Sequence, residues 1–146
     1  MSKQRTLVLI KPDGMPRIKD IRSMLVEKAN IIDGITSNDI KKIRDLYKEH
    51  EGQFFYGYIM EHFRNKFYRA YLIEEKEGYE YKNGFFQDII DLVGNTDTAK
   101  ASPGTIRAMS DDTLDTAIKE KRGVRNIIHR SATPKDAERE IKIFFD

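Results

Sequence analysis

The segment Arg5-Thr-Leu-Val-Leu-Ile-Lys-Pro-Asp-Gly14 joins a short apolar run, rich in aliphatic residues, to a Pro-Asp-Gly turn. An uninterrupted apolar run of this length, bounded by turn residues, is typical of a buried strand. Residues 5–11 therefore predict a central strand of a sheet, and Pro12 and Gly14 end it because both residue types favour turns.

Helix signals lie on both sides of this strand. Apolar side chains recur at three- and four-residue spacing over residues 17–29 and 84–93, and Gly94 follows the second run as a helix-ending glycine. Three more helices are expected. The first is capped by Ser37 or Asn38 and carries Ile40, Ile43 and Leu46 on one face, and a short aromatic helix follows over 54–63. The last begins at the capping box Thr133-Pro-Lys-Asp136 and runs towards Phe144.

A further short helix is predicted between Ser110 and Gly123. Acidic residues stand first and basic residues last in this stretch, an order that the helix dipole favours, and Gly123 is expected to close it.

Three more strands complete the pattern. They are expected over residues 30–36, where Asp33-Gly34 interrupts a weak strand, over residues 67–73 and over residues 124–129. Few, widely spaced strands mixed with helices predict an α+β sandwich in which helices cover one face of a four-stranded sheet. Residues 1–146 are expected to form a single domain, because no repeat or linker-like run divides them.

Composition excludes several classes of protein. The chain has 26 basic and 24 acidic residues, a net charge of +2, which argues against binding nucleic acid through bulk charge. The longest stretch without a charged residue is Gly52–Met60, too short to span a bilayer. The absence of cysteine removes disulfides and thiolate chemistry. With no apolar signal region at the start, the chain is expected to be soluble and cytoplasmic.

His129 is the histidine whose context suggests chemistry, because it ends an apolar strand, whereas His50 and His62 lie in polar surroundings and are expected to be ordinary residues. Glu140 shares the inward face of the last helix with apolar neighbours, and a carboxylate aimed inward needs a partner. We expect Glu140 to hold one ring N–H of His129 and leave the other nitrogen free as nucleophile or base, with Ser131 bonded to the carboxylate. A purely structural pair that closes the helix onto the sheet fits the same pattern.

A long polar loop is a candidate phosphate site. Gly94-Asn-Thr96 and Ser102-Pro-Gly-Thr-Ile-Arg107 offer small residues, hydroxyls and one arginine, a combination that phosphate binding uses. Lys11 at a strand end and the aromatic run over 54–58 could add a cation and a stacking surface for a base. Each of these features also has an ordinary reading, as a loop, a surface lysine or a core cluster.

Taken together and in this order, the segments 5–14, 94–96, 102–107, 124–129 and 137–141, with Ser131, resemble the nucleoside diphosphate kinase family. The resemblance implies a ferredoxin-like α+β sandwich with a four-stranded antiparallel sheet. It also implies a ping-pong phosphotransferase that moves the γ-phosphate of a nucleoside triphosphate to a nucleoside diphosphate through phosphohistidine at His129.

The resemblance further assigns roles to individual residues. Glu140 and Ser131 would orient the ring, and Tyr47 would line the phosphate site beside it. The remaining positions implied to bind nucleotide are Lys11 and Asn126 at the sugar hydroxyl and terminal phosphate, Thr96 and Arg107 at the inner phosphates, and Phe54 stacked on the base with Tyr58 beside it. Magnesium would be held by phosphate oxygens and water rather than by a protein metal site. Members assemble as hexamers, tetramers or dimers, so a homo-oligomer is expected, with no membrane or specific nucleic-acid partner.

Several departures from the family pattern stand out. Ile90 occupies the place of a second phosphate-binding arginine, and Arg130 follows the histidine where the family has a small residue. We hypothesise that Arg130 supplies part of the lost positive charge. Ile90 is also the one feature that favours the alternative function, a catalytically weak nucleotide-binding scaffold. Residues 108–122 form a longer segment than the family carries there, and Tyr47 and Phe54 stand one residue closer together.

Overall fold

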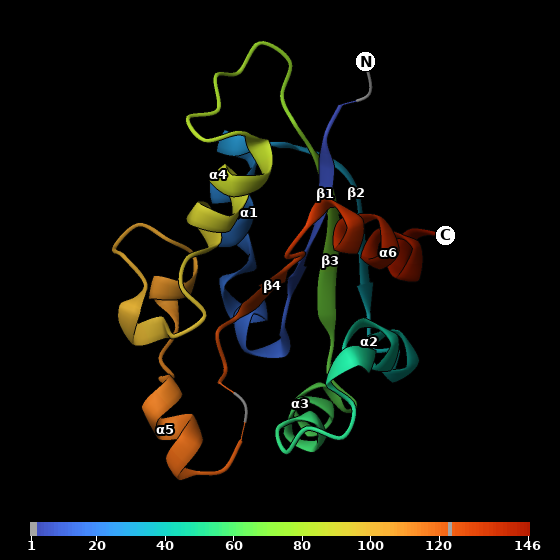
Figure 1. Cartoon of the computed structure of the whole chain (residues 1–146), viewed down its shortest axis with the longest axis vertical. Helices are drawn as coiled ribbons and strands as arrows, with labels where there is room; N and C mark the ends of the chain where they lie inside the picture. Colours follow the sequence, from blue (N-terminus) through green and yellow to red (C-terminus); the bar gives the residue numbers. More distant parts are fainter. Residues whose placement is uncertain (1–2, 123) are drawn as a thin grey trace.

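The strand predicted from residues 5–11 lies inside the sheet. The structure, a computed structural model, describes residues 3–122 and 124–146. β1 (Arg5–Ile10) pairs with β3 (Tyr68–Glu74) on one side and with β4 (Ile128–Arg130) on the other, and β2 (Asn30–Ser37) pairs with β3 at the far edge. Every pairing is antiparallel and the order is β2-β3-β1-β4 (Figure 1). This is the predicted ferredoxin-like α+β arrangement.

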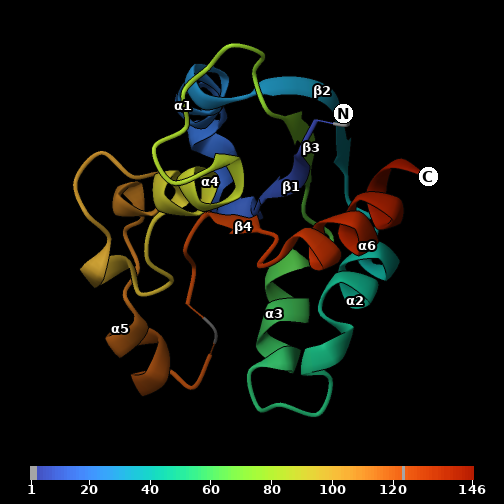
Figure 2. The same cartoon turned by 45° about the horizontal axis from the view of Figure 1, so that its top comes forward.

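Helices cover both faces of this sheet, so the expectation that they cover only one was wrong. On one face α1 (Ile18–Lys28) and α4 (Phe85–Val93) pack against Val8, Ile10 and their neighbours; on the other α2 (Ile40–Leu46), α3 (Tyr56–Phe63) and α6 (Pro134–Phe145) pack against Leu7 and Leu9 (Figure 2). The physical reason lies in β1, where residues 6–10 are all buried, so that both sets of alternating side chains need a covering layer.

Most helices lie where the sequence predicts them, with small differences in the residues at which they begin and end. The cap of α2 is Asp39, whose carboxylate accepts the Lys41 N–H at 2.9 Å, and not Ser37 or Asn38 as predicted. Ser37 accepts the Asp39 N–H instead and shapes the approach to the helix. Thr133 caps α6 as predicted, accepting the Asp136 N–H at 3.1 Å.

The strand predicted over residues 124–129 is confirmed only at its end, since β4 begins at Ile128. Ile127 has a φ of 63°, which takes it out of extended geometry. Its N–H donates to the Asp13 carboxylate at 3.0 Å, and its carbonyl accepts the Lys11 N–H at 2.9 Å. The backbone before β4 therefore binds the turn after β1 rather than continuing the sheet.

That turn is the 3-10 helix η1 (Pro12–Arg17), and it packs tightly on Ile127. A side chain at Gly14 would place its Cβ in steric overlap with the Ile127 carbonyl oxygen, so the position requires glycine. The turn predicted from Pro12 and Gly14 thus also holds the segment that leads to His129.

The longer segment of residues 108–122 begins within the 3-10 turn η4 (Arg107–Met109) and contains the short helix α5 (Leu114–Lys119), which lies away from the sheet (Figure 2). Thr113 caps α5, and Gly123, predicted to close it, lies outside the described residues. The Arg122 guanidinium donates to both oxygens of Asp112, at 2.6 and 2.8 Å, and this bond holds the pKa of Asp112 at about 2. The backbone before α5 and the backbone after it are therefore tied together.

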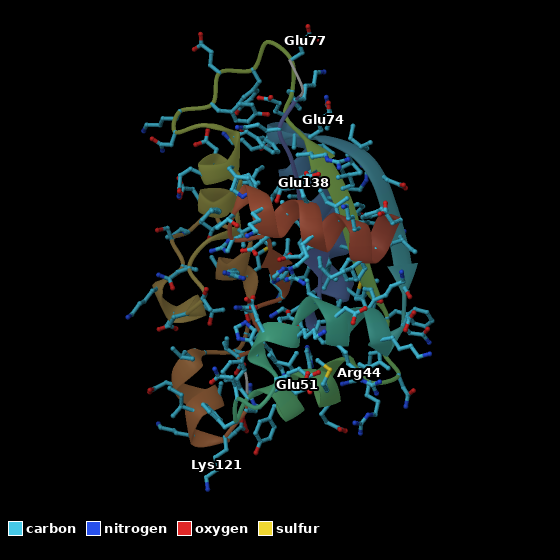
Figure 3. The ribbon with its side chains drawn as sticks, turned by 45° about the vertical axis from the view of Figure 1, so that its right-hand side comes forward. Arg44, Glu51, Glu74, Glu77, Lys121 and Glu138 are labelled. Atoms are coloured by element: carbon cyan, nitrogen blue, oxygen red, sulfur yellow. The ribbon has the colours of Figure 1, made fainter. Side chains whose placement is uncertain are left out.

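The other short 3-10 turns are η2 (Lys48–His50), between α2 and α3, and η3 (Thr98–Lys100), in the polar loop. Charged side chains such as Glu77 and Lys121 extend from the surface at the two ends of the molecule (Figure 3). Across residues 3–122 and 124–146, none of the helices has both the length and the apolar character that crossing a membrane requires.

Candidate active site

His129 lies in β4, the edge strand beside β1, and faces α6. Its Nε2 donates to Glu140 Oε1 at 2.7 Å, and Ser131 Oγ donates to the same oxygen at 2.9 Å. Glu140 is 4% exposed, and Arg139 lies 3.6 Å from its second oxygen. The pairing expected from the sequence is therefore present, with Glu140 holding Nε2.

The ring of His129 is set up to stay neutral with a free lone pair. Burial lowers its pKa; the Glu140 carboxylate opposes this, while Lys11 and Arg107 add to it. A neutral ring that keeps its proton on Nε2 leaves Nδ1 unprotonated. Nδ1 has no hydrogen-bond partner among residues 3–122 and 124–146, and the Tyr47 ring packs against the His129 ring in a T-shaped arrangement with the centroids 5.7 Å apart. Nδ1 is the atom left for chemistry.

Lys11 ends up at the base of this site because β1 stops one residue before it. Its Nζ donates to Asn126 Oδ1 at 2.8 Å, and Asn126 Nδ2 donates to the Thr96 carbonyl at 3.2 Å. Burial and the nearby Arg107 charge lower the pKa of Lys11 to about 8. Three predicted residues from distant parts of the chain thus form one connected group.

Arg107 connects the polar loop to β4. Its Nη1 donates to the Gly94 carbonyl at 3.1 Å and to Thr96 Oγ1 at 3.3 Å, and its Nη2 donates to the Ile128 carbonyl at 2.9 Å. Burial and the Arg130 charge lower its pKa to about 10, so the group remains a cation at neutral pH. The loop predicted to bind phosphate is therefore fixed next to the histidine strand by its own arginine.

Sequence reasoning missed Asp13 and the use of His62. His62 Nε2 lies 2.9 Å from Asp13 Oδ1, while Asp13 Oδ2 accepts the Ile127 N–H. The pKa of Asp13 is lowered because the contact with His62 and the Lys11 charge outweigh burial. The pair links α3 to the backbone beside Asn126. The available signal was the position of Asp13, two residues after Lys11 in the turn.

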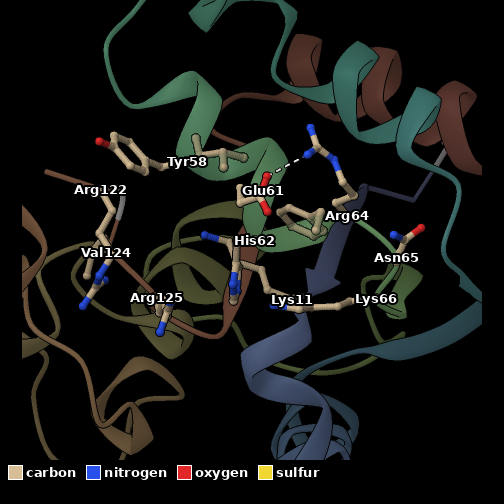
Figure 4. A pocket seen from close by; sticks show the side chains of 12 residues that line it. Lys11, Tyr58, Glu61, His62, Arg64, Asn65, Lys66, Arg122, Val124 and Arg125 are labelled. Atoms are coloured by element: carbon tan, nitrogen blue, oxygen red, sulfur yellow. Dashed lines mark hydrogen bonds and ion pairs between the residues drawn. The ribbon is translucent and has the colours of Figure 1, made fainter. Parts of the chain in front are cut away.

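The aromatic residues predicted to bind the base separate in the structure. Tyr58 lines a cavity of about 270 Å³ whose walls also include Lys11, Arg122, Val124 and Arg125 (Figure 4). Phe54 is 72% exposed, lies outside the lining residues of this cavity and packs edge-on against Phe55. The stacking role implied for Phe54 stays a prediction.

Comparison with known proteins gives the family. The family model described as nucleoside diphosphate kinase matches residues 4–146. The chain belongs to the nucleoside diphosphate kinase family. Two relatives named nucleoside diphosphate kinase, from Sulfurisphaera tokodaii and Saccharolobus solfataricus, are each 33% identical; the matches cover 99% and 100% of this chain and 90% and 97% of theirs.

Solved structures agree with this assignment. A transition-state mimic of nucleoside-diphosphate kinase from Borrelia burgdorferi, with bound vanadate and ADP, superimposes with a TM-score of 0.85 at 25% identity, over 99% of this chain and 88% of that one. An NDP kinase from Pyrobaculum aerophilum, at 22% identity, shares the fold with a TM-score of 0.84, over 99% of this chain and 97% of that one.

Membership makes the chain a phosphotransferase that acts on nucleoside triphosphates and diphosphates, a reaction for which the family uses a divalent metal ion. The alternative, a weak scaffold of the nucleoside diphosphate kinase fold, rests on Ile90 alone and has no better support.

Proposed function

We propose that His129 carries the phosphoryl group between the two nucleotides. Its Nδ1 attacks the γ-phosphorus of the triphosphate, the bond to the β,γ-bridging oxygen breaks, and the diphosphate leaves with that oxygen. In the second half-reaction a terminal oxygen of another diphosphate attacks the same phosphorus and the P–N bond breaks. The observation that carries this proposal is the bond from Nε2 to buried Glu140, which leaves Nδ1 as the one ring atom with a lone pair.

Glu140 and Ser131 position the ring. A bound phosphoryl group on Nδ1 makes the ring more positive at Nε2–H, and a buried carboxylate 2.7 Å away stabilises that charge. Ser131 donates to the same carboxylate oxygen and so limits where it can move. The pair thus acts through the histidine rather than on the phosphate.

Lys11, Asn126, Thr96 and Arg107 make up the proposed phosphate-binding group. Two buried cations beside His129, joined through amide and hydroxyl side chains, favour a polyanion in the space they face. Tyr47 packs against the His129 ring, and we propose that the base stacks on an exposed aromatic side chain, Phe54 or Tyr58, which suits broad nucleotide tolerance because any base can stack.

At this site, Mg²⁺ would bind to the phosphates of the substrate rather than to protein side chains. Residues 3–122 and 124–146 contain no group of three histidine or acidic side chains able to hold a metal ion, and both oxygens of nearby Asp13 are engaged. We therefore propose that phosphate oxygens and water bind Mg²⁺, which supplies neutralising charge to the phosphates.

We also propose the domain organisation, the oligomeric state and the cellular location of the enzyme. Both apolar cores pack on one sheet, which supports a single domain over residues 1–146. We propose a homo-oligomer, as a hexamer, tetramer or dimer, which the family resemblance implies, and a cytoplasmic location.

The test is a labelling experiment. The protein incubated with γ-labelled ATP and magnesium is expected to form a phosphoenzyme that acid destroys and base spares, and to pass the label to added GDP. His129→Gln should take up no label, whereas the matched control His50→Gln should label normally. Equal labelling of His129→Gln, or no labelling of the wild-type protein, would reject the proposal.

The pH profile of enzyme phosphorylation should have two limbs. Protonation of His129 removes its lone pair, so the rate falls on the acid side, below the ordinary histidine value of about 6.5 because the pKa is lowered. Lys11 loses its charge as pH rises through about 8, so phosphate binding weakens on the basic side. Single-turnover kcat/KM for MgATP between about pH 5 and 9.5 measures both limbs of the free enzyme.

Lys11→Arg is the control for this profile, because a guanidinium stays charged and should shift the basic limb to higher pH. An unchanged basic limb in Lys11→Arg would show that another group titrates there.

A further inference from the structure

A second hollow, of about 590 Å³, adjoins the active site and is lined by parts of α4, the polar loop and β4. Its walls include Ile90 and Gly94 from the end of α4, Thr96 and Ser102 from the loop, and Arg130 from β4. Ile90 contributes only apolar surface here. The cations that line the hollow are Arg130, from β4, and Lys100, from the loop, and Asp91 of α4 adds one carboxylate.

The guanidinium of Arg130 lacks hydrogen-bond and ion-pair partners within the described residues. Its Nε is buried without a hydrogen-bond partner, and within residues 3–122 and 124–146 its side chain forms no ion pair. Burial also lowers its pKa, although the Glu140 charge opposes this. A guanidinium that is partly withdrawn from water and lacks an acceptor is a binding group for an anion.

Arg107 lies close by and strengthens this conclusion. Its Nε is also buried without a partner, and the Arg130 charge contributes to its lowered pKa. A buried cation and a half-buried one beside it repel each other unless negative charge lies between or beside them. Arg130 thus lines the hollow, and Arg107 lies behind Thr96, one of the residues in its wall.

Thr96 connects this hollow to the phosphate-binding group already described. Its Oγ1 accepts from Arg107, so its own hydroxyl proton is available to donate, and its carbonyl accepts from Asn126, the partner of Lys11. A chain of polar groups therefore runs from Lys11 to the hollow that Arg130 lines.

From this arrangement we infer that Arg130 is a phosphate-binding residue, whose guanidinium holds an inner phosphate of the bound nucleotide beside Thr96, in the space bordered by Ile90. The inference rests on the proposed function and deepens it. Ile90 then marks a change in where the second cation comes from, from α4 to β4, rather than a loss of phosphate binding.

Titration of MgADP by calorimetry tests this assignment. Arg130→Met keeps the apolar stem and removes the charge and donors, and it should weaken the Kd for MgADP by about tenfold or more, as for the loss of a charged hydrogen bond. Arg22→Met, which alters an exposed arginine of α1, is the matched control and should bind as the wild type does. Thermal unfolding of each variant shows whether folding is unchanged.

A rescue experiment addresses position as well as charge. Ile90→Arg introduced into Arg130→Met should restore MgADP affinity to within about threefold of wild type, because both side chains border the same hollow. A Kd for Arg130→Met within twofold of wild type would overturn the inference, as would a loss that Ile90→Arg does not repair. A wild-type protein that forms no phosphoenzyme would instead overturn the proposed function itself.

Discussion

Replacement of His129 by glycine is expected to lower phosphoryl transfer by at least about 10⁴-fold, because the site loses the Nδ1 atom proposed to form the covalent intermediate. His129 lies between Glu140 and Tyr47, so its removal leaves a ring-sized space next to a carboxylate. Added imidazole should occupy that space and restore part of the activity, with the rate rising in proportion to imidazole concentration before saturation. The measurement is single-turnover transfer from MgATP to GDP.

Thermal unfolding of His129→Gly separates loss of chemistry from loss of the fold. Imidazole should have little effect on the wild-type protein. Activity of His129→Gly within about tenfold of wild type, without imidazole, would show that the phosphoryl group travels by another route.

Glu140→Ala is expected to have the second-largest effect, a decrease in kcat of about 10²- to 10³-fold, because the ring loses the partner that fixes its orientation and tautomer. Glu140→Gln should decrease kcat by less than about tenfold. Both bonds from His129 and Ser131 go to Oε1, and an amide oxygen at that place accepts them equally. Only the charge, and the contact between Oε2 and Arg139, would be lost.

The pH profile gives Glu140→Gln a readout that a purely structural role would not move. The Glu140 charge raises the pKa of His129, so its removal should shift the acid limb of enzyme phosphorylation to lower pH. An acid limb that stays in place, or a Gln variant as impaired as the Ala variant, would contradict a positioning role for the carboxylate.

The fold was largely predictable because its signals are local. The spacing of apolar residues located the helices, and the capping box at Thr133 set the start of α6 within one residue. The number of helical layers was not predicted, although the unbroken apolar run of β1 contained the clue, since alternating side chains buried on both faces need cover on both faces.

The site was predictable in part for a similar reason. Only a short loop and the first turns of a capped helix separate Glu140 from His129 in the chain. The two side chains therefore face each other once the helix packs on the sheet. Asp13 and His62 were not found as a pair, because α3 and the turn after β1 come together only through packing.

Local sequence was thus sufficient to predict which segments are helices and strands, to pair His129 with Glu140 and to indicate the family. Each of these depends on side chains close together in the chain or on a pattern of residue types. Tertiary packing alone decided which ring nitrogen is free, that Ile127 turns away from the sheet to meet Asp13, and that Arg130 and Ile90 border one hollow. Those three depend on distances between separate elements, which are set by how two apolar cores fill the space on either side of one sheet.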